Sequence, residues 1–366
     1  MTGTKALFRP FSLGSMSLSN RIVMAPMTRS KSPGGIPGEP VVEYYRRRAA
    51  NAVGLIITEG TTVDRPGASF DPAIPNFHNP ESLAGWKKVV DAVHAEGGKI
   101  APQLWHVGLA RRPGTGPHPD SPSDSPSGVL PNGKPVGEPM SAEDIADTIS
   151  AFARAAKAAA EIGFDAIELH GAHGYLLDQF FWDGTNKRDD RFGGGLVERT
   201  TLVQEIVKAV RAEIPADLPL ILRFSQWKQQ DYDAKLAQTP DELARFLGPL
   251  SEAGVDIFHA STRRFWLPEF EGSDLNLAGW TKKLTGKPSI TVGSVGLNSD
   301  FLGAFMGENS KAASIDGLIE RLENDEFDLV AVGRALINDP EWAVKVRDGR
   351  FDELSDFDAE KLKELV

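Results

Sequence analysis

The chain has 366 residues and a formal net charge of −11, because 51 acidic residues outnumber 40 basic ones. This negative charge disfavours nucleic acid or an anionic membrane as a partner. Cysteine is absent, which excludes disulfides, thiol nucleophiles and cysteine-held iron–sulfur clusters. No apolar run is long enough to span a bilayer, and the first residues lack the apolar core of a signal peptide, so we expect a cytoplasmic protein.

Short apolar runs rich in β-branched residues recur along the whole chain. Most are almost continuously apolar, which is typical of parallel strands that are buried on both faces. They predict eight strands, at residues 20–27, 53–60, 99–106, 165–172, 219–225, 255–261, 289–294 and 328–334.

Helical patterns separate these runs. The clearest begin with a side chain that can cap a helix and end on glycine. They are residues 79–98, 141–163 and 239–254, capped by Asn79, Ser141 and Thr239. Eight strand-then-helix units without a break in composition predict an α/β protein with one domain over residues 1–366, a (β/α)8 TIM barrel. A doubly wound sheet is the alternative, but the glycine fingerprint of a dinucleotide-binding turn is missing after the first strand.

Two segments fall outside the repeat. Residues 6–19 predict a small N-terminal hairpin around Gly14 that covers the bottom of the barrel. Residues 107–140, after the third strand, are rich in proline, glycine and serine and are long for a connection inside a compact domain. This long loop is either a solvated insertion or a cover over the active site, and we favour the second interpretation.

The carboxyl ends of the strands, where barrel enzymes place their chemistry, carry mostly neutral hydrogen-bonding groups. Glu59 is the only acidic residue among them, so a His–carboxylate metal site or a paired-carboxylate glycosidase centre lacks ligands or acids. His106 and His259 are interpreted as structural residues. The remaining donors and arginines suit a large, flat, oxygen-rich anion.

Glycine turns follow the last two strands, in VGSVG (292–296) and VGRA (332–335). Barrel enzymes often bind phosphate at this place, because glycine lets backbone amides approach the anion. Arg334 adds a planar, charged pair of donors. The two turns together predict a phosphate site.

The run HGAHGYLLDQF (170–180), followed by NKRDDRFGG (186–194), resembles the signature of the Old Yellow Enzyme family of flavin-dependent ene-reductases. The resemblance implies a (β/α)8 barrel that holds FMN noncovalently and takes electrons from NADPH or NADH. It extends over nearly the whole chain, through NRIVMAPMTR (20–29), IITEG (56–60), PQLWHVG (102–108) and AVGRALINDPEW (331–342).

The resemblance also implies which residues bind the flavin. The backbone around Ala25, Pro26 and Met27 would lie along the isoalloxazine ring, with Thr28 at its C4 carbonyl. Gly60 would leave space for the ring edge.

Further flavin contacts follow from the same resemblance. Gln103 would bind the pyrimidine portion, and Arg223 would lie near N1 and the C2 oxygen, where a cation favours the reduced, anionic flavin. The phosphate would be held by Gly333 and Arg334, assisted by the backbone near Gly293 and Ser294.

For catalysis, the resemblance implies that His170 and His173 donate hydrogen bonds to a carbonyl or nitro oxygen of the substrate. The polarised C=C bond would accept hydride from flavin N5, and Tyr175 would protonate the α-carbon. An unperturbed tyrosine has a pKa of about 10, so it retains the proton that it must deliver. Gly171 and Gly174 would permit the tight turn that brings these side chains together.

Several features leave the substrate open. Position 173 is asparagine in many members of the family, and FSQWKQQDY (224–232) replaces a common serine-proline turn, which puts loop shape and substrate range in doubt. Activated alkenes are the expected small-molecule partners, with reduction of nitro compounds or nitrate esters as a close variant.

Two competing functions are a metal-dependent hydrolase built on His170 and His173, and an FMN-binding module without catalysis. The sequence does not set the oligomeric state, and a homo-oligomer is compatible with it.

Overall fold

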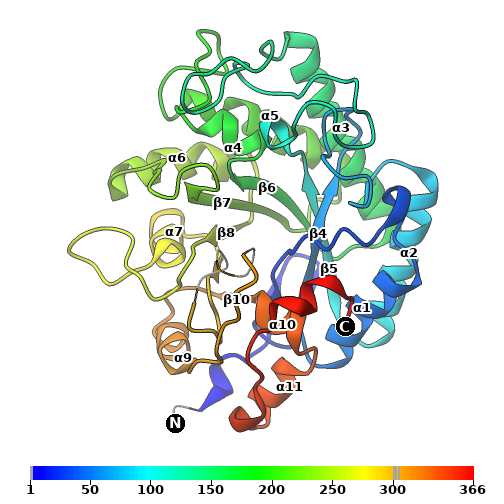
Figure 1. The fold of residues 1–366 in the computed structure, drawn as a ribbon. Helices are drawn as coiled ribbons and strands as arrows, with labels where there is room; N and C mark the ends of the chain where they lie inside the picture. The colour runs from blue at the N-terminus through cyan, green and yellow to red at the C-terminus, as the bar shows by residue number, and fades with distance from the viewer. Residues whose placement is uncertain (1–2, 300–302, 304–305) are drawn as a thin grey trace.

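A closed barrel of eight parallel strands forms the centre of the computed structural model, which describes residues 3–299, 303 and 306–366. Figure 1 shows the helices arranged around these strands. The strand order is β10-β3-β4-β5-β6-β7-β8-β9, and Val330 of the last strand pairs with Ile22 of the first. This closure confirms the TIM barrel and excludes the doubly wound sheet. The strands are β3 (Ile22–Met24), β4 (Leu55–Thr62), β5 (Lys99–Trp105), β6 (Ile167–His173), β7 (Leu220–Lys228), β8 (Ile257–Ser261), β9 (Ser289–Val292) and β10 (Leu329–Val332).

All eight predicted strands are present. Their buried, mostly apolar residues pack inward to fill the barrel and outward against the helices, which is why continuous apolar runs located them. β3 is shorter than predicted, with only Ile22–Met24 of residues 20–27 in the strand, whereas β7 continues past residue 225 to Lys228. This extension carries the strand to the rim of the barrel.

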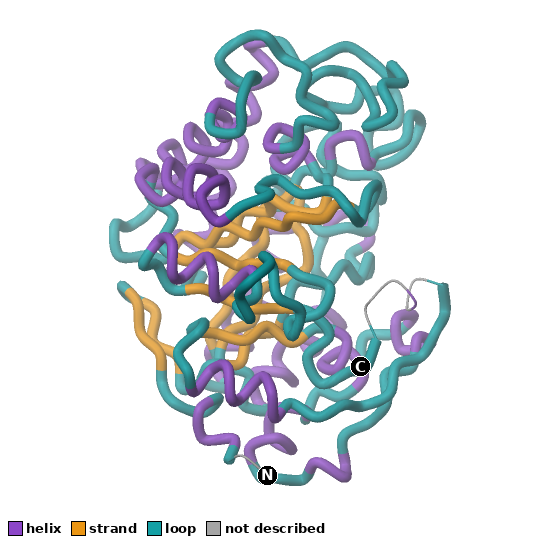
Figure 2. Tube along the Cα trace, turned by 90° about the vertical axis from the view of Figure 1, so that its left-hand side faces the viewer, coloured by secondary structure: helices purple, strands orange, loops and turns teal. Residues whose placement is uncertain are grey.

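The helices lie outside the strands, as the purple segments around the orange core in Figure 2 show. The three predicted N-caps are confirmed, since Asn79, Ser141 and Thr239 each accept a hydrogen bond from a backbone N–H of the first turn. None of the helices described in the chain is long and apolar enough to cross a bilayer. The helices are α1 (Glu39–Ala50), α2 (Pro80–Ala95), α3 (Ala142–Ile162), α4 (Leu176–Phe181), α5 (Thr201–Glu213), α6 (Pro240–Ala253), α7 (Leu277–Thr285), α9 (Asp316–Glu323), α10 (Arg334–Asn338) and α11 (Trp342–Arg347).

The predicted N-terminal hairpin is confirmed as β1 (Phe11–Leu13) and β2 (Met16–Leu18), which pair antiparallel. Gly14 adopts a φ of +55° at the turn, beside the carbonyl of Asp217. Side chains of both strands pack against residues that fill the barrel interior. The hairpin therefore covers the end of the barrel opposite the site described below.

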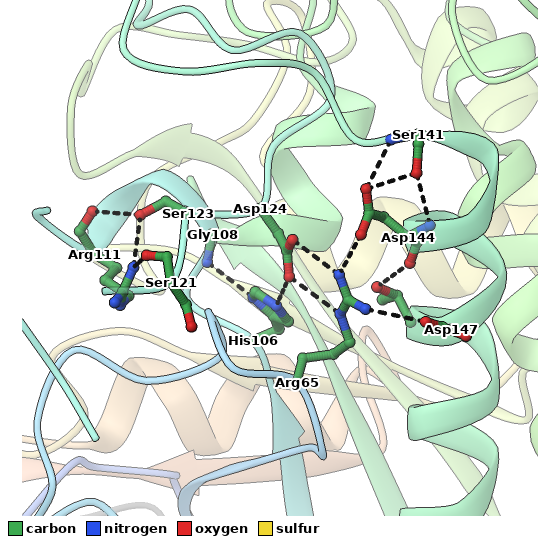
Figure 3. A network of polar contacts seen from close by, with 11 residues as sticks. Arg65, His106, Gly108, Arg111, Ser121, Ser123, Asp124, Ser141, Asp144 and Asp147 are labelled. Atoms are coloured by element: carbon green, nitrogen blue, oxygen red, sulfur yellow. Dashed lines mark hydrogen bonds and ion pairs between the residues drawn. The ribbon is translucent and has the colours of Figure 1, made fainter. Parts of the chain in front are cut away.

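The long loop of residues 107–140 is anchored to the barrel by buried polar contacts, which Figure 3 shows. The Nε2 atom of His106 lies 2.8 Å from Asp124, and Arg65 lies 3.1 Å from the same carboxylate and 3.0 Å from Asp144 of α3. Gly108 donates its backbone N–H to Nδ1 of His106. These contacts confirm the structural role predicted for His106 and attach the loop to the segments that directly follow β4 and β5.

Candidate active site

A cavity opens at the carboxyl ends of the strands. No residue of the long loop 107–140 lines it, so the prediction that this loop covers the site is wrong. The loop is held instead through Asp124, which contacts Arg65 and His106 just beyond the carboxyl ends of β4 and β5. Every predicted site residue except Gly60 lines the cavity: Ala25, Pro26, Met27, Thr28, Gln103, His170, His173, Tyr175, Arg223, Gly293, Ser294, Gly333 and Arg334.

Gly60 lies behind the cavity wall. A Cβ atom at this position would be 2.8 Å from Cδ2 of Trp105, closer than packed atoms approach. The missing side chain therefore makes room for the indole of Trp105, which does line the cavity. The structure assigns this space to a tryptophan, where the resemblance implied the edge of a flavin.

The two imidazoles face the same cavity because β6 is irregular. Residues three apart in a regular strand point to opposite faces. Here the pairing with β7 shifts between Gly171 and His173, and His173 adopts a left-handed φ of +65°. The imidazole centroids of His170 and His173 are consequently 5.0 Å apart, and the ring of Tyr175 lies 5.2 Å from that of His170. The irregular backbone falls at His173 and Gly174, whereas Gly171 stays in the strand.

Burial sets the protonation of these three groups. It lowers the pKa of His170 and of His173 well below the usual value for histidine, and the nearby Arg223 guanidinium lowers both further. Burial raises the pKa of the Tyr175 phenol. At neutral pH the site therefore presents two uncharged imidazoles, each with one N–H donor, and a protonated phenol. Nε2 of His173 lies 2.8 Å from the hydroxyl of Ser261, which fixes that ring.

A buried carboxylate orients the amide of Gln103. Glu168 accepts a hydrogen bond of 2.8 Å from Nε2 of Gln103, and its second oxygen lies 2.7 Å from Nδ1 of His259. Glu168 and His259 are completely buried. Glu168 was not predicted from the sequence, because it precedes the last residues of its strand. Its contact with His259 confirms the structural role predicted for that histidine.

Arginines lie at two places in the cavity wall. Arg223 of β7 is buried, which lowers its pKa to about 10, so its guanidinium is still charged at neutral pH. Arg334 begins α10 and donates to Ser310 Oγ at 3.0 Å and to the carbonyl of Ser299. Beside it, Gly293 has a φ of +142°, and a Cβ there would lie 2.7 Å from the Thr262 carbonyl oxygen. Only glycine fits that turn.

The cavity fits FMN. Its wall presents N–H and guanidinium donors together with the apolar surface of Ala25 and Met27, as a flat ring system with a phosphate requires. Nδ1 of His170 and Nε of Arg223 are buried polar atoms without a hydrogen-bond partner among the residues that the structure describes, which is expected where a ligand supplies the partner. A metal centre fits less well, because no three His, Asp or Glu side chains converge to hold an ion within the part of the chain that the structure describes.

The wall residues that were not predicted from the sequence include Trp227, Gln229, Ser261 and Arg263. The indole of Trp227 packs on His173, with ring centroids 4.6 Å apart. Gln229 directly follows the extension of β7 and lies on the rim. Residues 224–228, FSQWK, do not alternate between apolar and polar, so periodicity gave no signal that the strand runs on.

The family model described as NADH:flavin oxidoreductase / NADH oxidase family matches residues 6–353. The chain is 33% identical to 12-oxophytodienoate reductase 7 of Oryza sativa subsp. japonica, over 93% of this chain and 87% of that protein. It is 34% identical to the flavin oxidoreductase hxnT of Emericella nidulans, over 94% and 90% of the two chains. A solved structure of morphinone reductase in complex with tetrahydroNAD is similar with a TM-score of 0.81 and 28% identity, covering 97% of this chain and 93% of the other.

These matches agree with the cavity, which offers the donors and cations that FMN requires. The chain therefore belongs to the NADH:flavin oxidoreductase / NADH oxidase family, the Old Yellow Enzyme family, and is an FMN-dependent oxidoreductase that uses NADH or NADPH.

Proposed function

We propose that this protein is an ene-reductase that reduces activated C=C bonds of α,β-unsaturated carbonyl or nitro compounds. One observation carries the proposal: the imidazoles of His170 and His173 and the phenol of Tyr175 face one cavity that fits FMN. Reduction of a polarised alkene needs hydrogen-bond donors to the oxygen of the activating group and a proton donor near the α-carbon. The names of two similar proteins, 12-oxophytodienoate reductase and morphinone reductase, support a reductase of this type.

In this proposal His170 and His173 bind the oxygen of the activating group. Each neutral imidazole donates one hydrogen bond, and the donors become more effective as negative charge develops on that oxygen. Because burial keeps the pKa of both rings low, neither competes for the proton that the substrate carbon receives.

The wall residues named above would hold the flavin. Gln103, fixed by Glu168, would meet the pyrimidine part, Arg223 would face the side that gains negative charge, and Arg334 with Gly293 would bind the phosphate. Thr28 and the backbone from Ala25 to Met27 would lie along the ring. Bound FMN supplies hydride chemistry, taking hydride from the nicotinamide and giving it to the alkene.

Tyr175 supplies the proton for the α-carbon. Its raised pKa keeps the O–H bond intact until the substrate becomes basic enough to take the proton. The phenol lies beside His170, so proton donor and oxygen-binding group act on one small substrate.

The test is anaerobic titration of the FMN-loaded protein. We expect a yellow protein that bleaches with NADH or NADPH and regains its colour when 2-cyclohexen-1-one or a nitroalkene is added, with the saturated product formed in equal amount. Parallel assays with nitroaromatic compounds and nitrate esters would identify the preferred oxidant. A protein that retains FMN and is bleached by the nicotinamide, yet is reoxidised by none of the alkenes, would contradict the proposal.

A further inference from the structure

We propose that Gln229 positions the proton that Tyr175 delivers and stabilises the phenolate that forms. This inference rests on the proposed role of Tyr175. Nε2 of Gln229 donates a hydrogen bond of 3.0 Å to the phenol oxygen of Tyr175, and both residues line the cavity. The resemblance did not assign any role to position 229, which lies in the segment where this chain departs from the common family pattern.

The backbone holds Gln229 opposite the phenol. Its N–H donates to the carbonyl oxygen of His173 at 3.4 Å, which connects it to the turn that precedes Tyr175. One residue earlier, the ammonium of Lys228 lies 2.7 Å from Asp178 in α4, and the other oxygen of Asp178 accepts the N–H of Gly174 at 2.8 Å. Contacts on both sides therefore fix the distance between the end of β7 and the start of α4.

The geometry restricts the direction of the phenol proton. A phenol oxygen carries one hydrogen and accepts hydrogen bonds through its lone pairs. The amide N–H of Gln229 occupies one acceptor direction on Tyr175. The hydroxyl hydrogen must then point away from this amide, and the rest of the cavity lies there.

The same contact acts during proton transfer. The O–H bond of Tyr175 breaks, the proton forms the new C–H bond at the α-carbon, and the bonding electron pair stays on the phenol oxygen. That oxygen gains negative charge, which strengthens its hydrogen bond from Gln229. The contact also lowers the pKa of Tyr175, in opposition to burial, which raises it. A proton from water restores the phenol, and Gln229 is exposed at the rim where water arrives.

The experiment replaces the donor without changing the side-chain length, as Gln229→Met. In the FMN-loaded enzyme we expect flavin reduction by NADH or NADPH to be unchanged and reoxidation by 2-cyclohexen-1-one to slow roughly tenfold, the effect of one hydrogen bond to a group that gains charge. The alkaline limb of the reoxidation rate should move to higher pH. Gln238→Met is the matched control, because Gln238 is exposed and does not line the cavity.

Two further measurements distinguish positioning from a general structural effect. In the Tyr175→Phe background, Gln229→Met should cause no additional loss, because the atom that it positions is gone. Ultraviolet titration measures the pKa of the Tyr175 phenol, as the difference between each protein and its Tyr175→Phe counterpart. This pKa should be higher in Gln229→Met than in the wild type.

Full additivity of the two substitutions, or an unchanged phenol pKa, would overturn the role of Gln229. If Tyr175→Phe alone leaves reoxidation unaffected, the proposed proton donor fails. If Tyr175→Phe slows reoxidation and Gln229→Met does not, only the inference about Gln229 fails.

Discussion

The ammonium of Lys228 lies 2.7 Å from a carboxylate oxygen of Asp178, and neither side chain is exposed to solvent. Burial lowers the pKa of Lys228 and raises that of Asp178, so each charge depends on the other. The pair joins the end of β7, which directly precedes Gln229, to α4, which directly follows Tyr175. A buried ion pair thus sets the geometry of the proposed proton donor.

Lys228→Met should destabilise the protein by about 3–5 kcal/mol, because it leaves the Asp178 carboxylate buried without a partner. Adding Asp178→Asn should recover part of this loss, since the amide oxygen can still accept the N–H of Gly174. Urea unfolding of the wild type, the single variant and the double variant measures both effects. A Lys228→Met protein within about 1 kcal/mol of wild type, on the order of a surface substitution, would contradict the argument.

Tyr175→Phe should leave flavin reduction by NADH or NADPH intact and slow alkene reduction by about two orders of magnitude, in the range of a lost general acid. The ring is retained, so its packing on Trp105 at 4.8 Å persists. Stopped-flow absorbance separates the two half-reactions. An unchanged rate of reoxidation by 2-cyclohexen-1-one would remove Tyr175 from the proton-donor role.

His173→Ala should weaken the binding of phenols, which imitate the enolate formed on the substrate, by roughly ten- to a hundredfold. The substitution removes one of two donors and also the surface on which Trp227 packs. Titration of the flavin absorbance with 4-hydroxybenzaldehyde gives the dissociation constant. His94→Ala is the control, because His94 is exposed and pairs with Asp165 away from the cavity. Equal phenol affinity in wild type and His173→Ala would exclude the residue from oxygen binding.

Titration of Glu59 should make the free energy of unfolding depend on pH. Burial raises its pKa from 4.5 to about 7, although the backbone N–H groups of Arg29 and Ser30 donate to it. When the pKa of an acid is higher in the folded than in the unfolded state, the folded protein is most stable at a pH where the acid is protonated in both the folded and the unfolded state. Its contribution is therefore full below pH 4.5, decreases as pH rises to 7, and is lost above that value.

The contribution of Glu59 is measured by comparing the free energy of unfolding of wild type with that of Glu59→Gln. The glutamine cannot titrate but keeps an oxygen that accepts from the two backbone N–H donors. The stability of the variant relative to wild type should increase between pH 4.5 and 7, by up to roughly 3 kcal/mol. Urea unfolding across this pH range measures the difference. A difference that stays constant with pH would show that Glu59 does not titrate in this window.

The sequence alone located the eight strands, three capped helices, the hairpin at the barrel bottom and about half of the residues of the cavity wall. Parallel strands buried on both faces produce continuous apolar runs, and their carboxyl ends converge in any barrel, so local patterns were sufficient. The motif from His170 to Tyr175 could be recognised because its residues are close in sequence.

Tertiary structure decided the features that depend on residues far apart in sequence. Glu168 reaches Gln103 across 65 positions and His259 across 91, and Gln229 reaches Tyr175 across 54. The position of the long loop 107–140 depended on ion pairs from Arg65, and the space beside Gly60 went to Trp105. Local periodicity reports whether a residue is buried, but which side chains meet depends on how the barrel closes and where β6 and β7 shift register.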